Sequence, residues 1–336
     1  MRTERIVVDP LSPEPAALRY AAELIKGGKL VAFPTETVYG LGAHALDPQA
    51  VQRIYDAKGR PANNPLIVHV AERAQARELA RLWTSRAQRL ADRFWPGPLS
   101  LVLEKQPHVP DAVTAGSPTV ALRIPAHRVA RKLLMAAGVP IAAPSANRST
   151  HISPTSAEHV LAGLDGRVDL VLDAGPTPGG LESTVIDLTC DPPRLLRPGL
   201  IALAELEAAL EEPIASGTMA ADARRALPSP GMLARHYAPT VPVECVTDDG
   251  WQRASELAAA GERVGWLAWG LPRQSPPTET MLIWLPNNVE QYSARLYAAL
   301  HAFEAAAVQR IVAALPPDEP AWLAVRDRLA RASARE

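Results

Sequence analysis

The 336-residue sequence has little cysteine and no long apolar runs, and each shortage excludes a class of protein. Its two cysteines, Cys190 and Cys245, lie far apart and lack the paired spacing of a zinc or redox motif. No stretch approaches the roughly 20 apolar residues of a membrane span. The charged N-terminus MRTERIVVDP also lacks the apolar stretch of a signal peptide. We therefore expect a soluble cytoplasmic protein with reduced thiols and no membrane partner.

The chain also lacks a clear excess of positive or of negative charge. The formal net charge is −1, which gives no sign of a nucleic-acid or membrane partner for the chain as a whole. Only five of the 35 cationic residues are lysines, so arginine is the usual cation and Lys58 is an exception. A compact ammonium group at position 58 is a weak hint of a special role.

Several familiar catalytic signatures are missing as well. The sequence contains no GxxxxGK(S/T), HExxH, GxSxG or CxxC motif. These absences argue against P-loop hydrolysis, zincin, α/β-hydrolase and redox chemistry. No cluster of carboxylates suggests a metal held by the protein itself.

The first 211 residues predict a mixed, twisted α/β sheet. Helical periodicity in residues 13–28 and 47–59, and over most of 72–95, alternates with short apolar runs that read as strands. About seven such runs occur, with fewer helices than a strict βαβ series needs. The runs cover residues 29–34, 66–70, 99–104, 119–125, 140–146, 168–175 and 183–188.

A second, smaller domain is predicted for residues 241–336. It follows a proline-rich, aperiodic linker at residues 212–240. Strands near 241–246, 263–270, 281–286 and 309–315 and helices near 287–306 and 321–336 give it a Rossmann-like α/β rhythm. It lacks a glycine-rich phosphate loop, so no residue assigns it a nucleotide.

The stretch DAKGRPANNPLIVHV places two cations beside the predicted core. Lys58 and Arg60 precede Pro61 and Pro65, where no helix should continue, so we expect both on a loop. The strand LIVHV follows and ends near His69. Taken alone, the cations could simply be solvated, and His69 could be an ordinary strand histidine.

Polar residues recur beside the other predicted strands, and this repetition favours a binding site. Ligands of open α/β sheets bind outside strand ends, where such loops converge. Cations and hydroxyls with no clear nucleophile and base suit charge stabilisation at phosphorus, which favours a nucleotide, while Arg123 suits a carboxylate. The residues are Thr35 and Tyr39 in FPTETVYGLG, Arg123 in TVALRIP, Ser145 and Asn147 in APSANRS, Ser183 in LESTVIDL and Arg197 in LLRPG.

In this order, FPTETVYGLG, KGRPANNPLIVHV, ALRIP, APSAN, STVID and RPG resemble the YrdC family. SPGMLARHYAP followed by a small α/β domain resembles the family's long, two-domain form. The resemblance implies a YrdC-like catalytic domain at residues 1–211, a linker or lid at 212–240 and a Rossmann-like domain at 241–336. It implies an enzyme, an L-threonylcarbamoyladenylate synthase of the nucleotidyltransferase type.

Site roles follow from the resemblance by matching motifs. Lys58 and Arg60 are expected to be catalytic, with ATP as substrate and magnesium carried by the nucleotide. The implied ATP-binding residues are Lys58, Arg60, Asn64, Thr119, Ser145, Asn147, Ser153, Arg197 and Tyr237. The implied threonine-binding residues are Thr35, His69, Arg123, Ala143 and Ser183.

The implied reaction joins L-threonine, bicarbonate and ATP and releases pyrophosphate. Its product supplies threonylcarbamoyladenosine modification of tRNA through partner transferase proteins, and a weak contact with tRNA is compatible with this role. Residues 228–239, PSPGMLARHYAP, are expected to form a lid over the nucleotide.

Two alternatives remain open. One is a non-catalytic RNA-binding or ribosome-maturation factor with a YrdC-type fold, against which the near-neutral charge counts. The other is carbamoyl transfer, although no zinc-finger or acylphosphatase-like segment accompanies the YrdC-like region.

Overall fold

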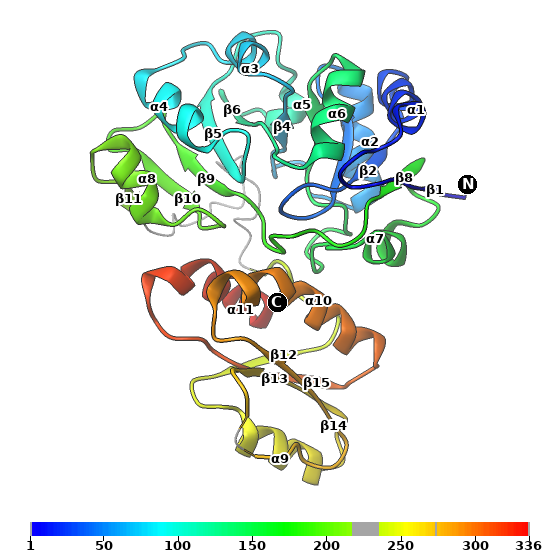
Figure 1. The fold of residues 1–336 in the computed structure, drawn as a ribbon, viewed down its shortest axis with the longest axis vertical. Coiled ribbons are helices and arrows are strands. Elements are labelled where there is room, and N and C mark those ends of the chain that lie inside the picture. The colour runs from blue at the N-terminus through cyan, green and yellow to red at the C-terminus, as the bar shows by residue number, and fades with distance from the viewer. Residues whose placement is uncertain (1, 217–234, 273, 335–336) are drawn as a thin grey trace. The chain divides into compact units, whose positions relative to one another are not determined.

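The computed structural model describes residues 2–216, 235–272 and 274–334, and it forms two compact units (Figure 1). The first unit takes in the described parts of Met1–Ser149, Pro154–Pro178 and Glu182–Met232. The second takes in Thr150–Ser153, Gly179–Leu181 and the described part of Leu233–Glu336. None of the described helices has the length and apolar character needed to cross a bilayer.

The first unit is built on one 11-stranded mixed sheet, which confirms the predicted fold class. Parallel and antiparallel neighbours alternate irregularly: β4 lies parallel to β6 and antiparallel to β7. In spatial order the strands are β1 (Glu4–Val7), β8 (Leu170–Asp173), β2 (Val31–Phe33), β3 (Gly40–His44), β7 (Ile141–Ala142), β4 (Ile67–His69), β6 (Thr119–Arg123), β5 (Leu99–Glu104), β9 (Thr184–Asp187), β10 (Arg194–Arg197) and β11 (Ala215–Ser216).

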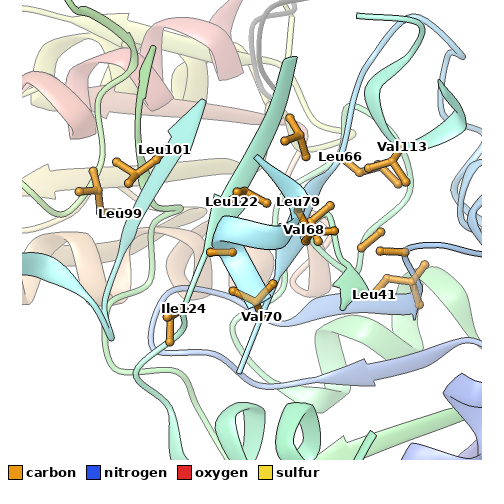
Figure 2. Close-up of a cluster of buried hydrophobic side chains, with 14 of the residues drawn as sticks. Leu41, Leu66, Val68, Val70, Leu79, Leu99, Leu101, Val113, Leu122 and Ile124 are labelled. Atoms are coloured by element: carbon orange, nitrogen blue, oxygen red, sulfur yellow. The ribbon is translucent and has the colours of Figure 1, made fainter. Parts of the chain in front are cut away.

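The main core lies on one face of this sheet. Residues such as Val68, Leu101 and Leu122 point to this face because side chains alternate along a strand (Figure 2). Burying such apolar surface against helices is the main stabilising contribution. The helices that supply residues to this core are α2 (Pro48–Lys58), α3 (Arg73–Leu79), α4 (Ser85–Phe94), α5 (Asp111–Thr114), α7 (Ala157–Leu164) and α8 (Leu203–Leu210).

The opposite face divides into two regions. Helices α1 (Pro15–Lys26) and α6 (Arg128–Ala137) form a second core with residues of β2, β7 and β8. The strands β4, β5, β6, β9 and β10 contribute a separate cluster of five apolar residues to this face. These five are Ile67, Val102, Ala121, Val185 and Leu196, and we call their surroundings the site face.

Two local features of this unit were not anticipated from the sequence. The helical pattern at 72–95 breaks into α3 and α4, because the chain is extended at Ala80 and Thr84 starts a new helix by capping Ala87 N–H at 3.1 Å. Gly40 and Gly42, in a segment for which no strand was predicted, lie in β3. A Cβ at Gly42 would lie 2.7 Å from Phe33 and 2.8 Å from Ile141, so close packing requires glycine there.

The second unit contains a four-stranded, all-parallel sheet, as expected for a Rossmann-like domain. Its order is β12-β15-β13-β14, and α9 was not predicted. The elements are β12 (Val243–Val246), α9 (Trp251–Ala259), β13 (Val264–Trp269), β14 (Thr280–Leu285), α10 (Val289–Ala305), β15 (Arg310–Ala314), a 3-10 helix (Pro320–Trp322) and α11 (Leu323–Ser333).

Most of the predicted lid lies outside the described residues, and its function stays a prediction. Of residues 228–239, the structure describes 235–239. Tyr237 is 1% exposed, and its ring lies 4.8 Å from the guanidinium carbon of Arg328 and 6.0 Å from the ring of Tyr297. These contacts anchor Tyr237 within the second unit.

Candidate active site

Lys58 and Arg60 are positioned by the end of helix α2. The helix continues through Lys58, so the prediction that Lys58 lies on a loop was wrong. It ends at Gly59, whose φ of 61° is the left-handed conformation that glycine adopts without strain. Arg60 follows this turn and is buried. Its Nε donates to the carbonyl oxygen of Asn64 at 3.0 Å, and its guanidinium donates to Asn64 Oδ1 at 2.6 Å.

The Lys58 ammonium reaches the segment that follows β7. Nζ donates to the carbonyl oxygen of Ser145 at 2.6 Å and to that of Asn147, and it lies 3.4 Å from Asn147 Oδ1. This network joins the KxR and SxN motifs, which are 87 residues apart in sequence at Lys58 and Ser145. The structure therefore brings Lys58, Ser145 and Asn147 together. Their shared role in binding the nucleotide stays a prediction.

The environment of Lys58 favours an anionic ligand. Burial, and then the nearby positive charge of Arg60, lower the pKa of Lys58 well below its usual range. Within the described chain, its hydrogen-bond acceptors are neutral oxygens. A phosphate group here would oppose both causes of the pKa shift, so anion binding and the ammonium form would stabilise each other.

Arg123 ends β6 on the site face and is 3% exposed. Its Nε donates to the carbonyl oxygen of Gly97 at 3.2 Å, and its Nη2 donates to Thr37 Oγ1 at 3.1 Å. The same Nη2 forms an ion pair with Glu36 Oε1 at 2.8 Å. Glu36 and Thr37 were not predicted as site residues, although both belong to the segment FPTETVYGLG.

Thr35 supports Arg123 through a relay of hydroxyl groups. Thr35 Oγ1 donates to the carbonyl oxygen of Val38 at 2.7 Å, accepts from Thr37 N–H at 3.1 Å and lies 2.7 Å from Thr37 Oγ1. These contacts use the hydrogen-bonding capacity of the Thr35 hydroxyl. In this arrangement the Thr35 side chain fixes Thr37, which in turn holds Arg123.

His69 ends β4 directly opposite Arg123 on β6. Burial, and then the charge of Arg123, lower the pKa of His69 to about 3, so the ring is neutral at ordinary pH. Its Nδ1 is buried and has no hydrogen-bond partner among the described residues. Ala143 lies nearby in the sheet and donates its backbone N–H to the carbonyl oxygen of Ile67 at 2.9 Å. The unpaired Nδ1 is suited to a ligand hydroxyl.

Ser183 and Arg197 contact each other, although they were expected on different sides of the site. Arg197 ends β10, and its guanidinium donates to the Ser183 carbonyl oxygen at 2.9 Å and to Ser183 Oγ at 3.1 Å. Ser183 Oγ also lies 2.9 Å from Ser100 Oγ. The distinct roles assigned to Ser183 and Arg197 stay predictions.

Of the remaining residues assigned to the nucleotide, Ser153 and Tyr237 belong to the second unit, and Thr119 belongs to the first. Ser153 is fully buried, and its carbonyl oxygen accepts from His301 Nε2 at 3.2 Å within that unit. Tyr237 packs there as described above. Thr119 begins β6 in the first unit, and its hydroxyl lies 2.8 Å from Ser117 Oγ.

Strand register arranges the first unit's residues in two groups. Thr119 and Arg123 occupy alternate positions of β6 that face the same side, four residues or about 13 Å apart. Asn64 precedes β4 and His69 ends it, and β4 runs parallel to β6. Asn64 and Thr119, two of the residues assigned to the nucleotide, therefore lie at the start of these two strands, and His69 and Arg123 lie at their ends. Arg197, also assigned to the nucleotide, instead lies across β9 and β5 from the end of β6. We call the first group, together with Lys58 and Arg60, the lysine end and the second group the arginine end of the site face.

The described residues include no group of three or more histidine, cysteine, aspartate or glutamate side chains that could hold a metal ion. Around Lys58 the chain instead offers amide, hydroxyl and carbonyl groups.

Comparison with known proteins shows the family to which the chain belongs. Residues 23–199 match the family model described as "Telomere recombination", which covers the Sua5, YciO and YrdC proteins, and residues 201–334 match the C-terminal domain of threonylcarbamoyl-AMP synthase. A two-unit α/β protein with this cationic site is thus a YrdC-type nucleotidyltransferase. The chain belongs to the threonylcarbamoyl-AMP synthase family.

Individual relatives support the same family over nearly the whole chain. The threonylcarbamoyl-AMP synthase of Pyrococcus abyssi is 45% identical over 94% of each chain. That of Bacillus subtilis is 41% identical over 99% of this chain and 98% of its own. The crystal structure of P. abyssi Sua5 complexed with L-threonine superposes with a TM-score of 0.90, at 43% identity and 98% coverage of each chain.

Proposed function

We propose that this chain joins L-threonine, bicarbonate and ATP into L-threonylcarbamoyladenylate and releases pyrophosphate. The carrying observation is that the first unit holds a buried lysine with neutral partners and a buried arginine with a carboxylate partner. The first suits a polyanion and the second an amino acid. Family membership supports the same reaction. The product would then serve tRNA threonylcarbamoyladenosine synthesis by transferase proteins in the cytoplasm.

The reaction has two bond-forming steps. The ammonium group of threonine and bicarbonate combine to a carbamate, with loss of one water and one proton. A carbamate oxygen then attacks the α-phosphorus of ATP, and the bond to the β-phosphate breaks to release pyrophosphate. Neither step needs an oxidant or reductant, and the protein contributes mainly by positioning and charge stabilisation.

Lys58 and Arg60 would stabilise charge on the phosphates at the lysine end. Asn64 fixes the Arg60 guanidinium, and Ser145 and Asn147 fix the Lys58 ammonium. Magnesium would arrive with the nucleotide, since the neighbouring protein groups are neutral oxygens rather than carboxylates. Thr119, Ser153, Arg197 and Tyr237 remain proposed as further nucleotide contacts.

Arg123 would hold the threonine carboxylate at the arginine end. His69, with its buried and unpaired Nδ1, would contact the substrate hydroxyl. Ala143 and Ser183 remain proposed as neighbours of the amino acid. Thr35 would act mainly by fixing Thr37 and, through it, Arg123.

The test is pyrophosphate release by the full chain with ATP, bicarbonate and single amino acids, with the adenylate product identified by mass spectrometry. We expect release that requires both threonine and bicarbonate. Tight RNA binding without threonine-dependent release would overturn the proposal in favour of an RNA-binding factor.

A further inference from the structure

Glu36 is a shielded carboxylate in the candidate site. Its side chain is 13% exposed, and neither of its buried oxygens has a hydrogen-bond partner among the described residues. Its ion pair with Arg123, at 2.8 Å, supplies charge attraction without a well-aligned hydrogen bond. A buried charged acceptor left without donors is costly, so this arrangement needs an explanation.

The surroundings of Glu36 hold it in place. Thr35 and Thr37, on either side of it, are both buried, and their hydroxyl groups are hydrogen-bonded. Thr37 also accepts from Arg123 Nη2. The loop that carries Glu36 is therefore tied to the same guanidinium that Glu36 faces.

Arg123 has unused hydrogen-bonding capacity on its other edge. Its Nε is bonded to Gly97 and its Nη2 to Thr37, while Nη1 makes no hydrogen bond to the described residues. The pair thus offers two unsatisfied groups side by side, a donor edge on Arg123 and an acceptor pair on Glu36. Within the described structure, each compensates the charge of the other.

An α-amino acid zwitterion is complementary to such a pair, since its carboxylate and ammonium groups are attached to one carbon. We propose that Glu36 binds the α-ammonium group of the amino-acid substrate while Arg123 Nη1 binds its carboxylate. This inference rests on the proposed function, because it places the amino acid at the arginine end. Glu36 is then a substrate-binding residue, and its ion pair with Arg123 lowers the cost of burying the guanidinium charge.

The assignment also gives the reaction a direction. Carboxylation replaces the ammonium with a neutral N–H and adds a negative carbamate. Glu36 attracts the first state and repels the second, whereas Lys58 and Arg60 attract the second. Before carboxylation, the substrate ammonium is therefore attracted to Glu36. After carboxylation, the carbamate is repelled by Glu36 and attracted to the lysine end.

The test compares threonine with two analogues by calorimetric binding to the full chain. One analogue, 2,3-dihydroxybutanoate of matching stereochemistry, has a hydroxyl in place of the ammonium; the other, L-threoninamide, lacks the carboxylate charge. Hydrogen bonds to charged groups are stronger than neutral ones, so Glu36→Gln should weaken threonine binding by roughly tenfold to a hundredfold. It should reduce the preference for threonine over the dihydroxy acid by a similar factor, and it should not reduce the preference over the amide, because Arg123 then lacks its acidic partner.

A matched control and a conservative variant complete the design. Glu158→Gln removes a glutamate that pairs with Arg5 on the surface of the same unit, and it should leave all preferences unchanged. Glu36→Asp keeps the charge and should retain the ammonium preference, with melting curves showing that each variant is folded. A Glu36→Gln protein with the wild-type preference for ammonium over hydroxyl would overturn this inference alone. Wild-type protein that neither binds threonine nor releases pyrophosphate with it would overturn the proposed function as well.

Discussion

The two ends of the site face treat buried positive charge in different ways. At the lysine end, the described hydrogen bonds of Lys58 go to neutral oxygens, and its pKa is depressed. At the arginine end, the guanidinium of Arg123 faces the carboxylate of Glu36. A cation with neutral partners keeps its field for an incoming anion, whereas a cation with an acidic partner presents almost no net charge.

This difference predicts which ligand each end accepts. A triphosphate supplies several negative charges and would compensate the lysine end. A zwitterionic amino acid brings no net charge and matches the arginine end. Substitutions at either end can test this difference, because they remove a cation, add an acidic partner or change the substrate.

The largest effect should come from removing the substrate hydroxyl at the arginine end. His69 Nδ1 is buried and unpaired within the described chain, so valine would leave it without a partner. A site that hydrogen-bonds a substrate hydroxyl rejects an analogue lacking it by roughly 10⁴-fold, while a missing methyl costs roughly 10-fold to 200-fold. We expect kcat/KM for pyrophosphate release to fall in the order threonine, serine, valine. Equal activity with valine and threonine would rule out the hydroxyl contact.

At the lysine end, Lys58→Ala should lower the rate most. Removing one preorganised charge donor typically costs about 10² to 10³ in kcat. Threonine affinity should change far less, because Arg123 and its partners are intact. Lys132→Ala, at an exposed lysine of α6, is the matched control. Wild-type turnover in the Lys58 variant would contradict a role in charge stabilisation.

Asn64→Asp gives the lysine end the acidic partner that the arginine end already has. The new carboxylate would stand where Asn64 Oδ1 now accepts from Arg60, at 2.6 Å. It should compete with phosphate and raise the KM for ATP by about tenfold, the size of an ordinary charge-assisted hydrogen bond. The KM for threonine should stay within error. Asn64→Ala separates loss of support from added charge, and an equal ATP effect in both variants would argue against the charge explanation.

The smallest effect concerns stability in acid. The pKa of His69 is about 3 in the folded protein, against 6.5 for a free histidine. Between these values the unfolded chain binds a proton that the folded one does not, so stability falls as pH drops from 6.5 towards 3. From pH 6.5 to 5.5 this linkage amounts to about 1 kcal/mol. Urea unfolding of His69→Asn should show that much less pH dependence than wild type. His108→Asn, at an exposed histidine, serves as the control, and an unchanged pH dependence for His69→Asn would contradict the burial effect.

Local patterns predicted many of the elements. Apolar runs such as LSLVLE and TVALRIP predicted β5 and β6, because a strand that is buried on both faces leaves a short, nearly continuous apolar run in the sequence. Glycine-rich GLGAH was not predicted as a strand, since its stability comes from pairing with β2 and β7 and from Phe33 packing against Gly42. The helical periodicity of residues 47–59 did predict α2, and only the expected loop position of Lys58 was wrong, because the helix ends at the Gly59 cap rather than before Lys58.

The sequence by itself determined the fold class, the motifs and the chemical types of the site residues, because these depend on local residue order. Tertiary structure decided how those residues are paired. It joined Lys58 to Ser145, Arg197 to Ser183 and Glu36 to Arg123 across gaps in the chain that no local pattern records. It also placed His69 beside Arg123 at the end of two neighbouring strands, because the register of β4 and β6 pairs these two positions. The charge of each end is a property of these long-range contacts, so it could be read only after the chain had folded.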